Sequence, residues 1–513
     1  MNTSLLLTAS IVTMAALAHG QTTGVTEESG EALRPRVHYS PQRNWMNDPN
    51  GPVYFDGEYH LFYQYNPNAA VMGHISWGHA VSKDLLHWRE LGVAIPEADG
   101  QMIFTGTVVV DENNTSGLCA NGDPCMIAVY TAHSGDGSTQ LETQDLAASQ
   151  DHGRTWSKYT GNPVLNLHMA NFRDPSVTWN EETKDWLMAV VLPDDHKVVF
   201  YTSSDLKHWT ELSRFGPANG ASGGQWECPS LLHVPSGDGQ QGVWALKVGI
   251  NPGALQGGSG EQFFLGSFDG KTFTQSGEPG SHGWTDYGKD SYCAVPFNHL
   301  PSGSRPTLIA WMDNWQYADK LPTSPWRGQM TLPRELTVVH DGDGFALVQR
   351  PLVSPLRNGG EKPVILRAKQ GPNNTFRAHG PTEFALRFEP GQAQVFGVRL
   401  YSDTQHWTEV GFDKTRHSVY VDRTHSGQRI AAGFPIRTDA PLATSRPLDL
   451  HMVLDRMSLE VFAQGGTVAI TNLIFPLQDT VLVRAFSIGN AAGMVANGHA
   501  WNLQSVHVQN DAQ

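Results

Sequence analysis

The stretch Asn44-Trp45-Met46-Asn47-Asp48-Pro49-Asn50-Gly51 places one carboxylate among amides, a proline and an indole. Pro has no backbone donor, and Asn and Gly tolerate left-handed backbone, so we expect a strand end and a tight turn here. Two strand-like runs follow, residues 52–55 and 59–63, separated by the hairpin signal Asp56-Gly57. Taken alone, the stretch is more simply a polar surface turn. Asp48 becomes a catalytic candidate only through partners further along the chain.

A short motif recurs after this hairpin. It consists of a Ser-x-Asp turn followed by an aromatic residue, and each copy comes after an apolar strand. The copies occupy residues 82–88, 149–156, 203–209 and, more weakly, 267–273. Recurrence at roughly 55–65 residues is typical of stacked four-stranded blades, and about 300 residues at that period predict about five blades of a β-propeller.

Length and composition predict an almost all-β protein of two domains. The 513 residues exceed one ordinary core, and 17% charged residues with 52 Gly, 31 Pro and 15 Trp favour short strands and turns. From about residue 370 the chain reads as alternating strands, which favour a β-sandwich. We therefore expect a signal peptide (1–20), a flexible leader (21–35), a five-bladed propeller (36–345), a Pro/Gly-rich linker (346–370) and a C-terminal β-sandwich (371–513).

The net charge of -15 argues against a nucleic-acid partner and favours a neutral, polar one. Residues 1–20 carry no charge, are mostly apolar from Leu5 to Leu17, and end in small residues. This pattern predicts a cleaved secretory signal and an extracellular or periplasmic protein without a membrane anchor, although a buried N-terminal helix is the alternative. The oligomeric state is left open between monomer and dimer.

The 4 cysteines do not form a disulfide framework. Cys119 and Cys125 flank a Gly-Asp-Pro turn and could pair in an oxidising compartment, a pairing that the sequence leaves open. Cys228 and Cys293 are expected to be free, packed thiols. The 22 His lack metal-ligand spacing, so no metal and no cofactor is expected.

Two further carboxylates stand out beside Asp48. They are Asp174, in Phe172-Arg173-Asp174-Pro175, and Glu227, in Trp226-Glu227-Cys228-Pro229. A propeller gathers inner-strand ends around one funnel, so distant carboxylates can converge there. Each block alone is more simply an ion pair or a turn; the three together indicate a catalytic site.

The surroundings of these carboxylates suggest distinct roles. Retaining glycoside hydrolysis needs one carboxyl group to attack the anomeric carbon and another to protonate the leaving oxygen. Packing against Trp226 and repulsion from Asp48 would raise the pKa of Glu227 and make it the acid. Among amides, Asp48 would stay ionised as the nucleophile. Beside Arg173, Asp174 would stay charged and hold two sugar hydroxyls.

The three blocks resemble the signature blocks of glycoside hydrolase family 32, the β-fructofuranosidases that include invertases, exo-inulinases and levanases. The resemblance implies a five-bladed propeller with a C-terminal β-sandwich. It also implies Asp48 as nucleophile, Asp174 as transition-state stabiliser and Glu227 as acid/base. The candidate substrate-binding residues that follow from it are Trp45, Asn47, Gln64, Trp77, Phe104, Thr105, Arg173, Tyr292 and Trp315.

The chain departs from the family pattern at three places. Thr105 stands where Ser is usual and keeps the hydroxyl, Ser291 replaces the aromatic residue of the common Asp-Phe-Tyr, and Asp313 stands where Asn is usual. Residues 312–318 and 325–327 look most like exo-acting fructanases. We expect a secreted retaining β-fructosidase acting on inulin, levan and sucrose. The alternatives are a sucrose-preferring invertase, a fructosyltransferase and, from another class, a catalytically idle fructan-binding protein.

Overall fold

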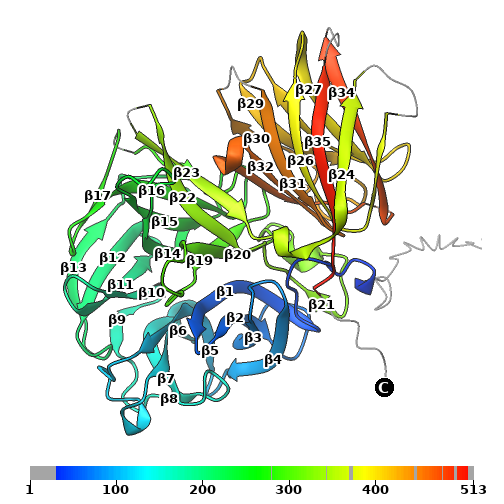
Figure 1. Cartoon of the computed structure of the whole chain (residues 1–513). Helices are drawn as coiled ribbons and strands as arrows, with labels where there is room; N and C mark the ends of the chain where they lie inside the picture. The colour runs from blue at the N-terminus through cyan, green and yellow to red at the C-terminus, as the bar shows by residue number, and fades with distance from the viewer. Residues whose placement is uncertain are drawn as a thin grey trace, which may run out of the picture.

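The computed structural model describes residues 30–506 except residues 279, 343, 369–373, 444–446, 477 and 490–493. The expected signal peptide and residues 21–29 of the leader lie outside the described residues. Nearly every named element is a strand, and the chain forms two β-rich domains (Figure 1). The named helical elements are the 3₁₀ turns η1 Ala120–Gly122, η2 Gly137–Thr139, η3 Ala318–Lys320, η4 Ser354–Leu356 and η5 Gln464–Gly466. None of the described helices is long and apolar enough to span a membrane.

The N-terminal domain contains five sheets among the described residues. The first contains, in spatial order, β21 (Trp326–Arg327), β1 (Asn44–Phe55), β2 (Glu58–Asn66), β3 (Ser76–Ser82) and β4 (Trp88–Ile95). The second contains β5 (Gln101–Asp111), β6 (Cys125–Ser134), β7 (Leu141–Ser149) and β8 (Ser157–Lys158), with β9 (Leu165–Met169) also paired to β7. The third contains β10 (Arg173–Asn180), β11 (Asp185–Leu192), β12 (Lys197–Ser203) and β13 (Thr210–Phe215).

The last two sheets complete this domain. The fourth contains β14 (Gln225–Val234), β15 (Val243–Asn251), β16 (Gly260–Phe268) and β17 (Phe273–Gln275), with β18 (Gly283–Trp284) also paired to β16. The fifth contains β19 (Tyr292–Pro296), β20 (Thr307–Trp311), β22 (Arg334–Asp341) and β23 (Gly344–Pro351). Each sheet is thus a meander of strands that follow one another along the chain, as the repeat predicts.

The first strands of the five sheets surround a common axis. β1 contacts β5, β5 contacts β10, β10 contacts β14, β14 contacts β19, and β19 returns to β1. The return is hydrogen-bonded, because the Asn298 amide donates to the Pro52 carbonyl at 2.8 Å. The late strand β21 also pairs in parallel with β1, which joins the two ends of the domain. The result is a propeller-like domain.

The recurrent Ser-x-Asp motif lies between the third and fourth strands of the first four sheets. In the first copy the Asp84 carboxylate accepts from the Ser82 hydroxyl and from the backbone amides of Leu86 and His87. Asp205 repeats this arrangement with Ser203. The fifth sheet instead joins β22 to β23 by a tight turn, which explains why the motif fades after Arg334.

The stretch around Asp48 is not a strand end. It lies inside the 12-residue strand β1, whose pairing with β2 is interrupted by register shifts between Met46 and Pro49 and between Asn50 and Val53. The Pro and Asn residues therefore produce bulges within a strand, where an unpaired residue can bend the chain. The predicted hairpin is confirmed, since Asp56 and Gly57 have φ of 47° and 81° and join β1 to β2.

The C-terminal domain is a β-sandwich of two sheets, seen above the propeller-like domain in Figure 1. One contains β24 (Arg357–Arg367), β35 (Val495–Leu503), β26 (Thr382–Glu389), β31 (Leu448–Leu454), β32 (Ser458–Ala463) and β33 (Val468–Leu473). The other contains β25 (Phe376–His379), β34 (Thr480–Gly489), β27 (Ala393–Tyr401), β28 (Trp407–Asp413), β29 (Ser418–His425) and β30 (Arg437–Pro441). Alternate residues of both sheets form one apolar core.

Two expected boundaries need correction. The expected linker, residues 346–370, contains most of β23 of the fifth sheet and all of β24 of the sandwich, so the domains are joined across residues 352–356. Of the Pro and Gly residues in this region, only Pro355 lies between the domains, in η4, and the others lie within β23 or β24. The described end of the expected leader, residues 30–35, is also held: Arg34 donates to the carbonyls of Pro41 and Gln42 and lies over Trp326.

Buried charges join the two domains. Arg334 of β22 pairs with Asp286 in its own domain and with Glu460 of the sandwich. The His38 imidazole lies 2.8 Å from both Asp455 and Glu460. An isolated buried charge would be costly, so these pairs fix how the domains meet.

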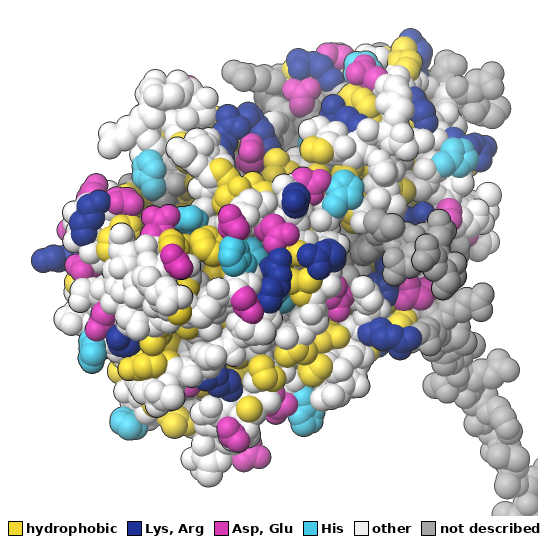
Figure 2. Space-filling model, turned by 60° about the horizontal axis from the view of Figure 1, so that its bottom comes forward, with side chains coloured by type: hydrophobic (Ala, Val, Ile, Leu, Met, Phe, Trp, Pro, Cys, Tyr) yellow, Lys and Arg dark blue, Asp and Glu magenta, His cyan; other side chains and the backbone are white. Residues whose placement is uncertain are grey.

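On the face shown in Figure 2, Lys and Arg side chains are interspersed with Asp and Glu and form no broad basic stripe. Together with the net charge of -15, this face lacks the basic patch that binding to a nucleic-acid backbone requires.

Candidate active site

Each of the five innermost strands has an irregular register at one end. The shifts lie between Met46 and Pro49 in β1, Ile103 and Gly106 in β5, Arg173 and Ser176 in β10, Glu227 and Ser230 in β14, and Tyr292 and Val295 in β19. Bulges redirect side chains and are common beside active sites. In three strands the residue within the bulge has positive φ: 65° at Asp174, 49° at Cys228 and 48° at Cys293. The expected site residues therefore lie where the regular hydrogen bonding between neighbouring strands is interrupted.

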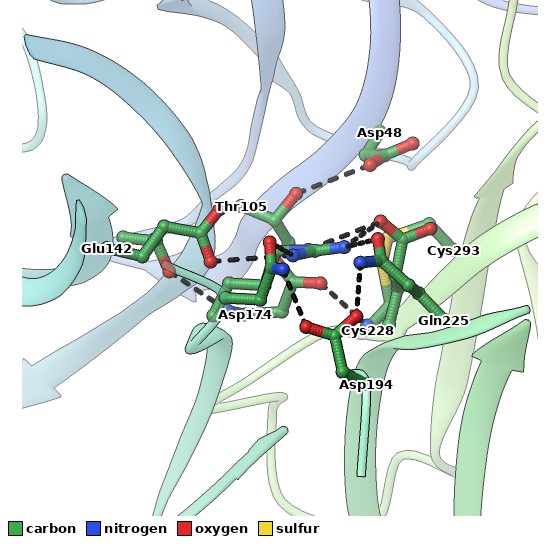
Figure 3. Close-up of polar contacts among 12 residues, drawn as sticks. Asp48, Thr105, Glu142, Asp174, Asp194, Gln225, Cys228 and Cys293 are labelled. Atoms are coloured by element: carbon green, nitrogen blue, oxygen red, sulfur yellow. Dashed lines mark hydrogen bonds and ion pairs between the residues drawn. A yellow bond between two sulfur atoms is a disulfide. The ribbon is translucent and has the colours of Figure 1, made fainter. Parts of the chain in front are cut away.

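A cavity of about 190 Å³ opens at this level of the axis. Eight of the predicted residues line it: Asn47, Asp48, Gln64, Phe104, Arg173, Asp174, Glu227 and Trp315. The structure thus brings together the three carboxylates that lie far apart in the sequence (Figure 3 labels Asp48 and Asp174).

The other four predicted residues support this wall. The Trp45 indole donates to Asn47 Oδ1 at 2.7 Å, and its ring stacks on Trp315 with centroids 5.9 Å apart. The Trp77 indole donates to the Phe104 carbonyl. Thr105 Oγ1 lies 2.6 Å from Gln64 Nε2, and the Tyr292 hydroxyl donates to Glu227 Oε2. These four side chains are buried and hold the lining residues in place.

Asp48 lies in a poorly solvated position. Its Oδ2 accepts from Gln64 Nε2 and Thr105 Oγ1, both at 3.4 Å, while its Oδ1 and the Asn47 Nδ2 have no partner among the described residues. Burial, and then the charges of Glu227 and Asp174, raise the pKa of Asp48 well above its usual range. The expectation that amide neighbours keep Asp48 readily ionised is therefore wrong for the ligand-free site.

Arg173 is the cation of this site. Its Nη2 donates to Glu227 Oε1 at 3.0 Å and to Gln225 Oε1 at 2.6 Å, and its Nη1 lies 3.4 Å from Glu142 Oε2. Asp174 instead accepts the Cys228 amide at 2.9 Å. Burial raises the pKa of Asp174 to about 7, and the charge of Arg173 opposes this only in part. The expected Arg173–Asp174 pair is thus replaced by an Arg173–Glu227 pair.

The expected packing of Trp226 on Glu227 is not found. The Trp226 ring is fully buried in the apolar layer between sheets, and its indole donates to the Ala221 carbonyl. Side chains alternate along a strand, so neighbours in sequence face opposite sides. Glu227 meets Arg173 and the Tyr292 phenol, whose pKa is raised well above its usual range chiefly by burial and which therefore remains a donor.

Sequence reasoning missed four residues around Arg173, of which Figure 3 labels Glu142, Asp194 and Gln225. Glu142 Oε2 accepts the Phe172 amide at 2.7 Å, and Asn171 Oδ1 accepts from Arg173 Nη1 at 3.2 Å. Asp194 then accepts from Asn171 Nδ2 and from Gln225 Nε2, each at 2.7 Å. Glu142 and Asp194 stand in no distinctive local pattern, so only tertiary structure connects them to the site.

The cysteines form two disulfides. Cys119 pairs with Cys125, the alternative that the sequence left open. Cys228 pairs with Cys293, so the expectation of free thiols there is wrong. The two residues are 65 positions apart and lie on neighbouring inner strands, a proximity that only the propeller-like closure creates.

One grouping of potential metal ligands occurs in the described part of the chain, formed by Asp48, Cys228 and Cys293, whose atoms lie within 4.8 Å of one another. Both sulfurs belong to the disulfide. Metal binding by Cys requires thiolates, so these residues do not fit a metal.

The arrangement suits chemistry at a polar, uncharged ligand. A pocket lined by the carboxylates of Asp48, Glu142, Asp174 and Glu227 and by the Arg173 guanidinium can bind hydroxyls. Two neighbouring carboxyl groups can supply a nucleophile and a proton. Asp48 Oδ1 and Asn47 Nδ2 are buried and have no hydrogen-bond partner among the described residues.

Comparison with known proteins relates this site to one family. Residues 38–351 match the description "Glycosyl hydrolases family 32 N-terminal domain", and residues 356–502 match "Glycosyl hydrolases family 32 C terminal". The two matches meet between Pro351 and Leu356, at the junction seen in the fold.

Individual relatives extend over most of the chain. A levanase of Bacillus subtilis (strain 168) is 40% identical over 459 residues, covering 87% of this chain and 67% of its own. An extracellular exo-inulinase of Aspergillus awamori is 38% identical over 499 residues, covering 90% and 92%. The crystal structure of exo-inulinase from Aspergillus awamori superposes with a TM-score of 0.86 at 36% identity, covering 93% of this chain and 99% of that one.

Proposed function

Because the chain belongs to family 32 of the glycosyl hydrolases, we propose that it is a secreted, retaining exo-β-fructosidase that removes terminal fructose from fructans and sucrose. The observation that carries the proposal is the convergence of Asp48, Asp174 and Glu227 on one pocket of about 190 Å³. Sites for drug-sized ligands are larger, so a pocket of this volume suits one terminal sugar ring. The levanase and exo-inulinase relatives support fructans as substrates.

Asp48 is the nucleophile in this proposal. Its carboxylate lines the pocket and attacks the anomeric carbon, forming a covalent fructosyl-enzyme. Glu227 gives its proton to the leaving oxygen and then takes a proton from the water that hydrolyses the intermediate. Atoms balance over the two steps, since one water is consumed and both protein groups are restored.

The protonation of the catalytic carboxyl groups follows from burial and from the repulsion between their charges. Asp48 is disfavoured as an anion by burial and by the charge of Glu227. When Glu227 carries a proton, that repulsion disappears and Asp48 ionises more readily, so the productive state has one proton on Glu227 and none on Asp48. Asp174 holds sugar hydroxyls, and Arg173 fixes Glu227 at 3.0 Å.

The lining residues bind the fructose ring. Asn47 and Gln64 line the pocket with amides that suit sugar hydroxyls, and Gln64 also joins Thr105 and Asp48. Trp315, stacked on Trp45, offers an aromatic face to the less polar side of the sugar. Secretion is supported by the apolar residues 1–20 and by the extracellular relative.

Product analysis tests the proposal. The purified protein is incubated with sucrose, raffinose, inulin and levan, and products are separated by chromatography, with Asp48→Asn as the control for contaminating activity. Free fructose from long fructans at rates comparable with sucrose supports an exo-fructanase. Internal oligosaccharides as the first products would exclude exo action. Longer sugars made from sucrose would indicate a transferase, and binding without any product would indicate the idle binding protein.

A further inference from the structure

The Cys228–Cys293 disulfide lies at the centre of the site rather than at its edge. Cys228 directly follows Glu227 on β14, and Cys293 directly follows Tyr292 on β19. The Tyr292 hydroxyl donates to the Glu227 carboxylate, so the residues that precede the two cysteines touch each other. A covalent bond and a hydrogen bond therefore join the same two inner strands at successive positions (Figure 3 shows the sulfurs).

Both cysteines occupy the bulge position of their strand. Cys228 and Cys293 have φ of 49° and 48°, and Asp174 has 65° at the matching position of β10, directly after Arg173. Residues other than Gly rarely adopt this backbone unless the surroundings hold it there. The disulfide is such a constraint, because it ties the two bulges of β14 and β19 together.

The disulfide-bonded cysteines also lie close to the carboxylates of Asp174 and Asp48. The Cys228 amide donates to Asp174 Oδ2 at 2.9 Å, and both sulfurs lie within 4.8 Å of a carboxylate oxygen of Asp48. Neither cysteine lines the pocket of about 190 Å³, whereas Cys228 lines a separate cavity of about 20 Å³ that Asp174 also borders. The buried disulfide therefore supports the residues that line the pocket without lining it.

We propose that the Cys228–Cys293 disulfide is a positioning element of the catalytic site, which holds Glu227 and Tyr292 in register with Asp48. The inference rests on the proposed function, since it assumes that Glu227 moves the proton. A misplacement of about 1 Å can lower turnover by about 100-fold, so release of this link changes kcat more than KM.

The chain supplies a matched control. Cys119 and Cys125 form the other disulfide, beside Asp111 at the opposite end of β5 from Thr105. Cys228→Ala/Cys293→Ala is compared with Cys119→Ala/Cys125→Ala for kcat, KM, pH profile and thermal unfolding. Both variants lose stability, the first more, because its disulfide closes the longer loop.

We expect kcat of the Cys228→Ala/Cys293→Ala variant to fall by about tenfold or more, with a displaced alkaline limb and KM within about threefold. The control keeps the wild-type kcat and pH profile. Equal kcat and pH profiles in both variants would overturn the inference. Failure of the proposed function is distinct, because the wild type itself would then release no fructose.

A second experiment tests the inference in case the Cys228→Ala/Cys293→Ala variant does not fold. In the Cys119→Ala/Cys125→Ala background the remaining disulfide is reduced by a phosphine, which supplies two electrons while water supplies two protons, and free thiols are counted by alkylation and mass spectrometry. Loss of kcat that returns on reoxidation supports the positioning role. Unchanged kcat with two free thiols per chain contradicts it.

Discussion

Arg423 of the sandwich donates from Nη1 to Asp290 Oδ2 of the propeller-like domain at 2.5 Å, and both side chains are fully buried. Arg423 Nη2 also donates to the Tyr317 hydroxyl at 2.8 Å, and Tyr317 donates to the other oxygen of Asp290. Asp290 lies two residues before Tyr292, which contacts Glu227. The sandwich therefore anchors the strand that supports the proposed acid.

Arg423→Ala is expected to lower both stability and turnover. Removal of one partner leaves the Asp290 carboxylate buried and uncompensated, which costs about 3–5 kcal/mol of unfolding free energy. Movement of Tyr292 would lower kcat by about tenfold, measured on protein that remains folded. Arg334→Ala is the control, because Arg334 makes a similar buried pair with Glu460 between the same two domains but, among the described residues, has no hydrogen bond to Asp290 or Tyr317. Equal kcat in the two variants would contradict the anchoring role.

Asp48→Asn is expected to abolish hydrolysis and retain the fold. The amide has nearly the same shape but cannot form the covalent intermediate, so kcat should drop by about 1,000-fold or more. The raised pKa of Asp48 also means that its charge destabilises the folded state as pH rises above the unfolded pKa of about 3.9. The variant should therefore unfold at a higher temperature than wild type at pH 7. Turnover near the wild-type rate would remove Asp48 from the mechanism.

The acid limb of the kcat/KM profile should lie above the ordinary Asp range of about 4, because Asp48 must be ionised and its pKa is raised. The negative charge of Asp174 contributes to that shift, so its removal lowers the pKa of Asp48. Asp174→Asn should move the acid limb to lower pH, besides reducing the rate. Profiles are recorded on sucrose at constant ionic strength; an acid limb that stays in place would separate Asp174 from the titration of the nucleophile.

Glu227→Gln should strongly slow sucrose hydrolysis, because the amide cannot give a proton to the leaving oxygen. A good leaving group needs no protonation, so β-fructosyl fluoride should be cleaved far better than sucrose by this variant. The ratio of the two rates, compared with wild type, measures the role of Glu227. A ratio that stays at the wild-type value in Glu227→Gln would identify another group as the acid.

The interdomain contact should depend on pH through His38. Burial opposes its charge, but the hydrogen bonds that His38 donates to Asp455 and Glu460, together with the charges of these two acids, outweigh burial and raise the pKa of His38 to about 9. Burial likewise opposes charge on Glu460, yet Arg334 and His38 lower its pKa to about 2. The His38 contribution is complete below pH 6.5 and is lost as pH rises through about 9. The Glu460 contribution is complete above pH 4.5 and is lost as pH falls toward about 2.

The substitution His38→Gln tests the contribution of His38 to stability between pH 6.5 and about 9. Below pH 6.5 the variant should lose on the order of 3 kcal/mol of unfolding free energy, and the decline of wild-type stability between pH 6.5 and 9 should flatten. The exposed His74, paired with Glu97 on the surface, supplies the control His74→Gln. Parallel pH dependence of thermal unfolding in His38→Gln and wild type would show that His38 does not carry this effect.

The sequence alone determined the features that local chemistry encodes. The Ser-x-Asp motifs determine the turns between third and fourth strands, because the Asp carboxylate accepts hydrogen bonds from nearby backbone amides. Asp84 does so with Leu86 and His87. Asp56-Gly57 determines a hairpin because both residues adopt positive φ. The blocks around Asp48, Asp174 and Glu227 identify the carboxylates through their unusual neighbours.

Tertiary structure alone decided how these groups influence one another. Closure of the inner strands places Cys228 beside Cys293 and Arg173 beside Glu227, across 65 and 54 positions of sequence. Burial then raises the pKa of Asp48 and Asp174, although amides and Arg173 had suggested charged groups. At Asp313, burial likewise raises the pKa of the carboxyl group well above its usual range. Desolvation depends on everything that surrounds a side chain, and neighbours along the chain are only a small part of that surrounding.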